Sequence, residues 1–275
     1  MICITGSSGF LGFPLLKKII NNNTIGIYNK NKPNINNIIK CDLTNKSEVK
    51  KMINHLKPNI LIHLAALPNP RFNESHKFDA KLLNVGITES LVDLLDKDTH
   101  LIFTSSDVVF DGSHSFPDED TQTSPKTYHG ELKIQCENLI KEKFDRYHII
   151  RLSTIHSNYD DNISLINKPI NSYINIALHK VKSCQNVEAF TNVKRCFTRL
   201  DELTSFLENL VVDSNYGTYH AGSKMTSYYE RILMLCKEND LDYRKYLIPI
   251  EGNVKPLMQN LNTSKLEKTF KFKFS

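Results

Sequence analysis

The chain has 275 residues, of which 40% are hydrophobic, and its formal net charge at pH 7 is +5. A chain of this length can bury a sizeable core without disulfides or metals. No apolar run approaches the roughly 20 residues that a membrane-spanning helix requires, which excludes such a span. The lysines are spread along the chain rather than gathered into a basic block, so we expect a solvated surface and no nucleic-acid partner.

Cysteine and histidine usage predicts a compartment and argues against a metal site. The six cysteines are scattered with no CxxC pair, and the first residues do not have the pattern of a secretory or transit segment. This predicts reduced thiols in a cytoplasmic protein. His156, His179 and His220 are isolated and lack the spacing of metal ligands, so we expect core or surface roles for them and no bound metal.

The predicted elements alternate between strands and helices through the first ~150 residues, which is typical of repeated βα units around a parallel sheet. Short apolar runs predict strands at 1–5, 24–28, 37–41, 59–65, 100–105 and 147–153. Helices are predicted to begin near Phe10, Lys46, Phe78 and Lys126. The near-continuous Ile, Leu and Val in the strands suit a sheet that is buried on both faces.

The pattern loosens after residue ~155, where "HSNYDDN" (156–162) and "KPIN" (168–171) are loop signals. Further helical segments are predicted near 164–182, 199–212 and 225–239. We therefore expect an α/β fold, a Rossmann-type doubly wound parallel sheet with a small C-terminal α/β substrate lobe. The predicted domains are 1–155, which binds NAD(P), and 156–275, which binds substrate, with some of the later chain returning to the first domain.

A glycine-rich loop follows the first strand. In "TGSSGFLG", Gly6 permits a tight turn, Gly9 allows backbone to approach a pyrophosphate, and Gly12 allows close packing at the helix start. Ser8, Phe10 and Leu11 lie between these glycines and are included in the predicted cofactor site. The G-x-x-G-x-x-G spacing differs from the G-x-G-x-x-G fingerprint, so a merely tight turn is the alternative.

The end of the second predicted strand indicates which dinucleotide is preferred. NAD-preferring sites usually place an acidic residue there to hold the adenosine ribose hydroxyls. This chain has "YNKNK" instead, with Asn29, Lys30 and Lys32 and no carboxylate. A lysine at this place would bind a 2′-phosphate, so we predict NADP(H) as the preferred cofactor and NAD(H) as a possible one. The alternative is that both lysines are solvated loop residues.

Three further stretches fit the same cofactor. "CDLTN" follows a predicted strand and offers an acceptor for the adenine amino group, "HLAALP" offers small residues where backbone could line the cofactor, and "LLNVG" offers an amide within a helix. Without the glycine loop, each of these stretches would more readily be structural. The residues concerned are Asp42, Leu43, Ala65, Ala66, Leu67 and Asn84.

These motifs together make the chain resemble the extended short-chain dehydrogenases/reductases and, within them, the dTDP-4-dehydrorhamnose reductase family. The match runs from "TGSSGFLG" through "CDLTN", "AAL", "FTSSDVVFDG", "SP…YHGELK…E" and "IIRLS" to "YHAGS" and "KPLMQNLNTSKL". The most specific stretch is "SSDVVFDG", which is similar to the family pattern S-T-D-Y-V-F-x-G. The resemblance covers nearly the whole chain.

The resemblance implies a Rossmann domain with a small substrate lobe, and reduction of a 4-keto-6-deoxy nucleotide sugar by NADPH or NADH in deoxysugar or surface polysaccharide synthesis. By position, Ser106 corresponds to the hydroxyl that hydrogen-bonds the keto oxygen, and Asp107 to its neighbour at the substrate. Ser105 would lie near the cofactor, and Lys133 would bind the nicotinamide ribose and lower the pKa of the catalytic acid. A serine-rich strand end can also be a turn with local caps.

The segment "TYHGELK" departs from the family pattern Y-G-x-x-K. The residue before Gly130 and four before Lys133 is His129, while Tyr128 stands five before it. At 3.6 residues per turn, a side chain four positions away is rotated by about 40° and one five positions away by about 140°. His129 is therefore expected to face Lys133, unless the helix begins later or carries a bulge.

This substitution leaves three outcomes open for catalysis. His129 replaces the tyrosine as acid or electrophile with help from Ser106, or local distortion returns Tyr128 to the site, or proton transfer is lost. Because Lys133 would repel an imidazolium, we expect His129 to be mostly neutral. The third outcome is a noncatalytic NADP-binding regulatory subunit, and the resemblance includes such a relative, the beta subunit of methionine adenosyltransferase.

The sequence says less about the substrate and the assembly. Arg151 ends a predicted strand on the side where such sheets bind ligands, so it is a candidate for the substrate diphosphate, as are Arg195 and Arg199. Each could instead be a surface or helix-end arginine. Epimerase or dehydratase chemistry stays a further alternative, and a homodimer or a partner enzyme is possible.

Overall fold

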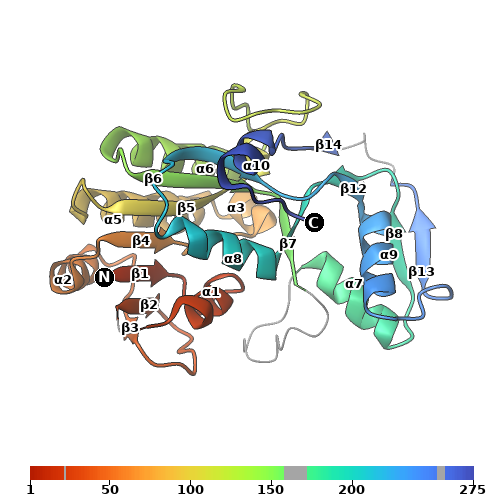
Figure 1. Cartoon of the computed structure of the whole chain (residues 1–275), viewed down its shortest axis with the longest axis horizontal. Helices are drawn as coiled ribbons and strands as arrows, with labels where there is room; N and C mark the ends of the chain where they lie inside the picture. The colour runs from red at the N-terminus through yellow and green to blue at the C-terminus, as the bar shows by residue number, and fades with distance from the viewer. Residues whose placement is uncertain (22, 158–171, 253–257) are drawn as a thin grey trace. The chain divides into compact units, whose positions relative to one another are not determined.

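The computed structural model describes residues 1–21, 23–157, 172–252 and 258–275 of the chain (Figure 1). The chain forms two compact units made of alternating segments. Unit 1 comprises Met1–Asp111, Thr121–Arg151 and Thr204–Tyr219, and unit 2 comprises Gly112–Asp120, Leu152–Leu203 and His220–Ser275. Most of the predicted "HSNYDDN" loop, all of "KPIN" and the first part of the 164–182 segment lie outside the described residues. The predicted NAD(P) and substrate domains stay predictions.

The main sheet has seven strands in the order β11-β6-β5-β4-β1-β2-β3. The central strand β1 pairs in parallel with β2 on one side and β4 on the other, and β2–β3 and β4–β5 are also parallel. The order 3-2-1-4-5-6 is that of a doubly wound Rossmann sheet, so the predicted fold class is confirmed. The strands are β1 (Ile2–Thr5), β2 (Thr24–Tyr28), β3 (Ile38–Lys40), β4 (Ile60–His63), β5 (His100–Ser106), β6 (Tyr147–Leu152) and β11 (Gly217–Ala221).

Helices connect these strands. The predicted starts near Lys46 and Phe78 agree with the structure, whereas those near Phe10 and Lys126 each come two residues before the observed Gly12 and Tyr128. The first helix begins at Gly12 rather than near Phe10, because the Gly9 N–H donates to the Gly6 carbonyl at 2.8 Å and closes a turn first. A short helix that begins with Pro70 precedes the predicted start near Phe78. The helices are α1 (Gly12–Ile19), α2 (Lys46–Leu56), α3 (Pro70–Ser75), α4 (Lys77–Lys81), the π-helical η1 (Leu82–Gly86), α5 (Ile87–Leu94), the 3₁₀ turn η2 (Asp107–Val109) and α6 (Tyr128–Lys143).

The main core of unit 1 lies between the sheet and a row formed by α2, α5 and α6 (Figure 1). Alternate residues of each strand face opposite sides of the sheet. Cys3, Leu61, Leu101 and Ile149 face this core, whereas their neighbours Ile4, Ile62, Ile102 and Ile150 are buried as well. Burial on both faces explains the continuous apolar strands in the sequence.

Unit 2 has its own core, built from two helices and a small parallel sheet. α7 (Tyr173–Lys182) and α9 (Tyr228–Glu238) pack with β8 (Val187–Phe190) and β13 (Leu247–Ile250). Ser227 and Glu230 form a capping box that fixes the start of α9. The other elements are β7 (Thr154–His156), β9 (Lys194–Arg195), β10 (Phe197–Arg199), α8 (Leu200–Leu210), which continues into unit 1, β12 (Thr226–Ser227), β14 (Met258–Gln259) and α10 (Ser264–Phe270).

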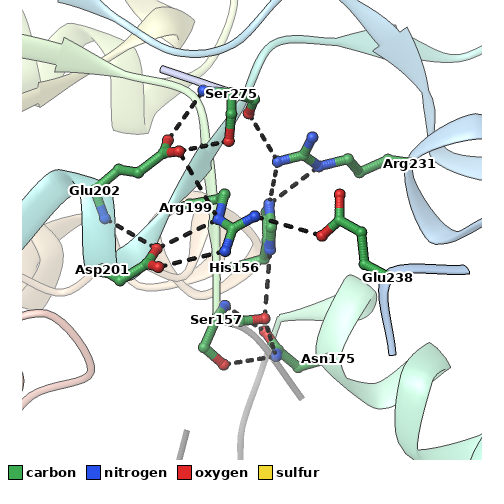
Figure 2. Close-up of polar contacts among 9 residues, drawn as sticks. All are labelled: His156, Ser157, Asn175, Arg199, Asp201, Glu202, Arg231, Glu238 and Ser275. Atoms are coloured by element: carbon green, nitrogen blue, oxygen red, sulfur yellow. Dashed lines mark hydrogen bonds and ion pairs between the residues drawn. The ribbon is translucent and has the colours of Figure 1, made fainter. Parts of the chain in front are cut away.

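A polar network joins two segments of unit 2, Leu152–Leu203 and His220–Ser275 (Figure 2). The buried Arg231 donates to His156 Nε2 from Nε at 3.1 Å and from Nη2 at 2.7 Å, so this nitrogen carries no proton. Burial, followed by the positive charge of Arg231, lowers the pKa of His156 to about 3. Arg199 pairs with Asp201 and Glu238 in the same network. His156 therefore has the core role that the sequence suggests.

Candidate functional site

The glycine loop between β1 and α1 is shaped by backbone contacts. Gly6 has a φ of 68°, and a side chain there would meet the Ala65 nitrogen at 2.8 Å. A Cβ on Gly12 would lie 2.1 Å from the Gly6 carbonyl oxygen. Leu11, at the N-cap of α1, has no side-chain acceptor, and the first turn contains no acidic residue. The loop therefore presents a helix N-terminus without a side-chain cap, which suits an anionic group such as a pyrophosphate.

The remaining predicted residues of this loop differ in exposure. Ser8 and Phe10 are half-buried and stay accessible, whereas Leu11 is buried. Ser7, which was not predicted, is fully buried and its hydroxyl has no hydrogen-bond partner among the described residues. Its position between Gly6 and Ser8 was the sequence signal that could have identified Ser7 as a member of this loop.

The ends of β2 and β3 bring Asn29, Lys30 and Asp42 together. Asp42 accepts hydrogen bonds from Thr44 N at 3.0 Å and Thr44 Oγ1 at 2.8 Å. These bonds lower the pKa of Asp42, and a hydrogen bond with Asn29 and the charge of Lys30 lower it further. Lys30 is exposed, whereas Leu43 is buried behind the strand ends. The three polar residues therefore form one cluster at this edge of the sheet.

The segment after β4 is held by two buried polar side chains. Thr5 Oγ1 accepts from the backbone N–H of Ala65 at 3.1 Å, and Asn84 Oδ1 accepts from that of Leu67 at 3.0 Å. Asn84 also donates to the Ala80 carbonyl at 2.8 Å. Asn84 thus shapes the segment 65–67 from within η1, while Ala66 is exposed.

Ser105 and Arg151 meet at a buried carboxylate that sequence reasoning did not single out. Ser105 Oγ donates to Glu137 Oε1 at 2.6 Å, and Arg151 donates to both oxygens of Glu137 at 3.1 and 2.9 Å. Arg151 also lies over the Phe110 ring. Ser105, predicted to lie near the cofactor, and Arg151, predicted to bind substrate, are therefore both hydrogen-bonded to a buried residue of the fold. Glu137 stands four residues after Lys133 on the same helix, and this spacing was the available signal.

Ser106 and Asp107 lie at the end of β5, where the chain turns into η2. Ser106 is half-buried, and its Oγ donates to Asp107 Oδ1 at 3.1 Å and accepts from Val108 N at 3.4 Å. Asp107 is buried. The hydroxyl of Ser106 thus has the local capping contacts of a strand-to-turn junction and is also partly accessible.

Tyr128, the first residue of α6, is held by the α3–α4 segment. Its backbone N–H donates to Glu74 Oε1 at 2.6 Å, and its hydroxyl donates to the Lys77 carbonyl at 3.3 Å. The Lys77 ammonium lies over its ring, 5.1 Å from the centroid. The Tyr128 hydroxyl is therefore committed to the backbone at the start of α4.

His129 is buried, and its ring contacts a different residue of the same segment. Its Nδ1 lies 2.7 Å from Asn73 Nδ2. Burial, and then the positive charge of Lys133, lowers the pKa of His129 to about 4. His129 is therefore neutral at pH 7, as expected, but burial contributes more to this than the repulsion from Lys133 on which the expectation rested. Asn73 was missed because it lies far from His129 in the sequence, in a segment without a motif.

Lys133 is buried one turn further along α6. Its Nζ donates to the Thr104 carbonyl at 2.8 Å and lies 4.7 Å from the centroid of the Phe103 ring. Burial lowers the pKa of Lys133, and the charge of Glu137 acts in the opposite direction. Lys133 is thus anchored to β5 next to the serine pair.

The helix start that carries these residues depends on Gly130 and Thr127. Thr127 Oγ1 accepts from the Gly130 N–H at 3.1 Å and caps the helix. A Cβ on Gly130 would lie 2.2 Å from the Val108 carbonyl oxygen. Only glycine lets α6 approach η2 this closely, so the backbone contact places His129 and Lys133 beside the end of β5.

The two further arginines considered for the diphosphate, Arg195 and Arg199, lie in unit 2, as do His179 and His220. Arg195 is in β9, and Arg199 is in the polar network of Figure 2. His179 is exposed on α7, while the backbone N–H of His220 donates to Glu119 Oε1 at 2.8 Å. Within the described ranges, no group of His, Cys, Asp and Glu has the arrangement of a metal site, and no helix could cross a bilayer.

Curated relatives match the chain over different lengths. Methionine adenosyltransferase 2 subunit beta of Xenopus laevis is 28% identical over 287 residues, covering 96% of this chain and 81% of the relative. dTDP-4-dehydrorhamnose reductase of Aggregatibacter actinomycetemcomitans is 27% identical over 163 residues, covering 58% of this chain and 53% of the relative.

Solved structures share the fold. The dTDP-4-dehydrorhamnose reductase of Bacillus anthracis in complex with NADP has a TM-score of 0.81 at 20% identity, covering 99% of this chain and 94% of that chain. The UDP-glucose 4-epimerase of Thermotoga maritima with UDP-glucose has a TM-score of 0.81 at 15% identity, covering 100% and 93%. At these identities the likeness concerns the fold alone.

The match to a family model extends over every part of the chain described above. The model described as RmlD substrate binding domain matches residues 1–275, which includes the glycine loop, the end of β5, helix α6 and unit 2. The chain therefore belongs to the RmlD substrate binding domain family, as its resemblance to the dTDP-4-dehydrorhamnose reductases predicts.

Proposed function

We propose that the protein is an NADP(H)-dependent reductase of a 4-keto-6-deoxy nucleotide sugar, acting in deoxysugar synthesis. The observation that carries the proposal is the packing of α6 against the end of β5: Ser106 ends β5, and α6, which carries His129 and Lys133, meets η2 at Gly130 and bonds Thr104 through Lys133 Nζ. The uncapped glycine loop of α1 lies in the same unit. Ligands of doubly wound sheets bind outside the carboxyl ends of the strands, where these residues lie. The relatives that act on or bind nucleotide sugars and NADP support the same assignment.

The preference for NADP(H) follows from Lys30. Its exposed ammonium lies in the cluster at the ends of β2 and β3, where the adenosine ribose of a dinucleotide would lie. A 2′-phosphate there would pair with this charge. Asp42 would accept a hydrogen bond from the adenine side of the nucleotide, and Asn29 would donate one to it. Neither contact involves the 2′-phosphate, so NAD(H) is a second ligand for the site.

The chemistry requires a hydride at the keto carbon and a proton at the keto oxygen. The bound reduced nicotinamide would supply the hydride. The N–H of neutral His129 and the hydroxyl of Ser106 would donate hydrogen bonds to the oxygen as its negative charge develops, and the proton would reach it from solvent through these donors. Lys133, held by Thr104, would orient the nicotinamide ribose and stabilise that charge. Ser106 would turn from Asp107 to the substrate.

A second candidate function is a noncatalytic NADP-binding partner subunit. The observation that favours it is the position of Tyr128, whose hydroxyl is bonded to the Lys77 carbonyl. Neutral His129 is also a weak proton donor. A relative that is similar over 96% of this chain, from Xenopus laevis, is named methionine adenosyltransferase 2 subunit beta.

Two measurements test the proposal. Nucleotide fluorescence titration reports NADPH binding, and NADPH oxidation is then followed with dTDP- and UDP-4-keto-6-deoxy sugars. Ser106→Ala, His129→Ala and Lys133→Ala should each lower turnover by about 100-fold or more. Loss of turnover in Tyr128→Phe would instead assign the proton to Tyr128. If NADPH binds and no keto sugar is reduced, the noncatalytic function replaces the reductase, and a stoichiometric enzyme partner in a pull-down would identify its role.

A further inference from the structure

Asn73 contacts both His129 and the segment after β4 from inside helix α3. Its side-chain nitrogen Nδ2 lies 3.2 Å from the Leu67 carbonyl oxygen and 2.7 Å from His129 Nδ1. Asn73 is 0% exposed and His129 is 6% exposed, so water does not compete for these contacts. Because the Leu67 carbonyl and His129 Nδ1 share the Asn73 amide nitrogen, the role of the carbonyl determines the role of His129 Nδ1.

The Leu67 carbonyl fixes which way the Asn73 amide points. A backbone carbonyl can only accept, so the atom of Asn73 that faces it is the NH₂ group. Turning the amide by 180° would place Oδ1 against the Leu67 carbonyl oxygen and would remove the bond that Nδ2 donates to that carbonyl. In the observed orientation, only Asn73 Oδ1 has no hydrogen-bond partner among the described residues. One unbonded acceptor costs less than a lost hydrogen bond together with a repulsive contact between two buried oxygens.

The second hydrogen of this NH₂ group points to His129, so His129 Nδ1 must be the acceptor. A neutral imidazole that accepts at Nδ1 carries its proton at Nε2. We propose that Asn73 is a positioning residue that holds His129 in the Nε2–H tautomer. His129 then presents a donor and not a base at the position four residues before Lys133. Only the use of that donor toward a keto oxygen rests on the proposed function.

The tautomer can be read directly in the unmodified protein by NMR. With ¹⁵N-labelled histidine, long-range ¹H–¹⁵N spectra at pH 7 should show an unprotonated Nδ1 and a protonated Nε2 for His129, whose signals are those lost in His129→Gln. With asparagine labelled as well, a coupling across the hydrogen bond should join Asn73 Nδ2 to His129 Nδ1. A protonated Nδ1 in the wild type would overturn the proposal.

Two variants of the same chemistry separate positioning from structural support. Asn73→Asp replaces the donor by an acceptor, so His129 should change to the Nδ1–H form. Asn69→Asp is the matched control, because Asn69 caps α3 by accepting from Phe72 N at 3.2 Å and aspartate caps equally well. It should leave His129 unchanged. An unchanged tautomer in folded Asn73→Asp would refute the role of Asn73.

The consequence for turnover is tested separately. If the reductase assignment holds, Asn73→Asp should lower kcat by about tenfold or more, since the donor is lost at the reacting oxygen, while the Kd for NADPH stays unchanged. If no keto sugar is reduced by the wild type, the NMR result still decides the tautomer. The turnover assay therefore reports a failure of the proposed function, and the NMR spectra report a failure of this inference.

Discussion

Glu137 and Arg151 form a two-contact ion pair inside unit 1, with N–O distances of 3.1 and 2.9 Å and side-chain exposures of only 2% and 3%. The pair joins helix α6 to strand β6, and Ser105 adds a third hydrogen bond to the same carboxylate. Burial alone would raise the pKa of Glu137, but the hydrogen bond and charge of Arg151 and the bond from Ser105 together outweigh it and lower the pKa. The carboxylate is thus charged, and both of its oxygens accept hydrogen bonds within the protein.

Removing Glu137 should destabilise the protein strongly. Glu137→Leu leaves the guanidinium of Arg151 buried without its carboxylate, which typically costs about 3–5 kcal/mol of unfolding free energy. Urea denaturation monitored by circular dichroism measures this loss. Lys141→Ala removes only the partly exposed partner at 3.3 Å and should cost less than about 1 kcal/mol. Equal losses of unfolding free energy in the two variants would show that the buried pair stabilises the protein no more than the partly exposed one.

Gly130→Ala should separate α6 from η2. The new methyl group would lie 2.2 Å from the Val108 carbonyl oxygen, so backbone must move, at a cost of roughly 3 kcal/mol. Gly86→Ala is the control, because its Cβ would meet only the tip of the Leu82 side chain at 3.3 Å and the Lys81 carbonyl at 3.9 Å. That variant should change thermal stability by less than about 1 kcal/mol. A Gly130→Ala protein as stable as Gly86→Ala would contradict the close approach.

Acid should unfold the protein through its buried histidines. Burial lowers the pKa of His63 to about 3, with a smaller effect of Lys133, and lowers the pKa of His156 to about 3. Since the folded pKa values lie below the unfolded value, the unfolded state binds more protons as the pH falls below about 6.5. At pH 5 each such histidine removes on the order of 2 kcal/mol from the free energy of unfolding.

The measurement is the slope of unfolding free energy against pH between 6.5 and 4. His63→Gln should reduce the proton uptake on unfolding by about one proton in this range. His55→Gln, which changes an exposed side chain of α2, should leave the slope close to that of the wild type. A slope that is the same in all three proteins would exclude His63 as a source of acid sensitivity.

Reversing the charge of Lys30 should change cofactor choice. In Lys30→Glu, a 2′-phosphate would meet a carboxylate, so the Kd for NADPH should rise about tenfold or more while that for NADH changes little. Lys50→Glu makes the same charge change on exposed α2 and serves as the control. Fluorescence titration with both nucleotides measures the four affinities. A parallel loss of NADH and NADPH binding would argue against a phosphate contact.

The sequence predicts best what depends on neighbouring residues. The six apolar runs became strands β1 to β6, and the glycine loop follows β1, because strand burial and helix starts are local properties. The short α3 was not predicted, since a six-residue helix that begins with proline has little periodicity. The partners of Arg151, Ser105 and His129 were not predicted. The spacing from Lys133 indicates the helix face of Glu137 but not its partners, because Glu137 and Asn73 reach these residues only through tertiary packing of α6 and α3.

The alternation of chain segments between the two units has a consequence for synthesis on the ribosome. Unit 1 includes Thr204–Tyr219, so it cannot be completed until residue 219 has left the exit tunnel. By then two segments of unit 2, Gly112–Asp120 and Leu152–Leu203, have already emerged, while its last segment, His220–Ser275, is still to come. Each unit therefore stays incomplete until its last segment has been translated, and that segment follows part of the other unit in the chain. A nascent chain that stops near residue 155 has neither unit complete.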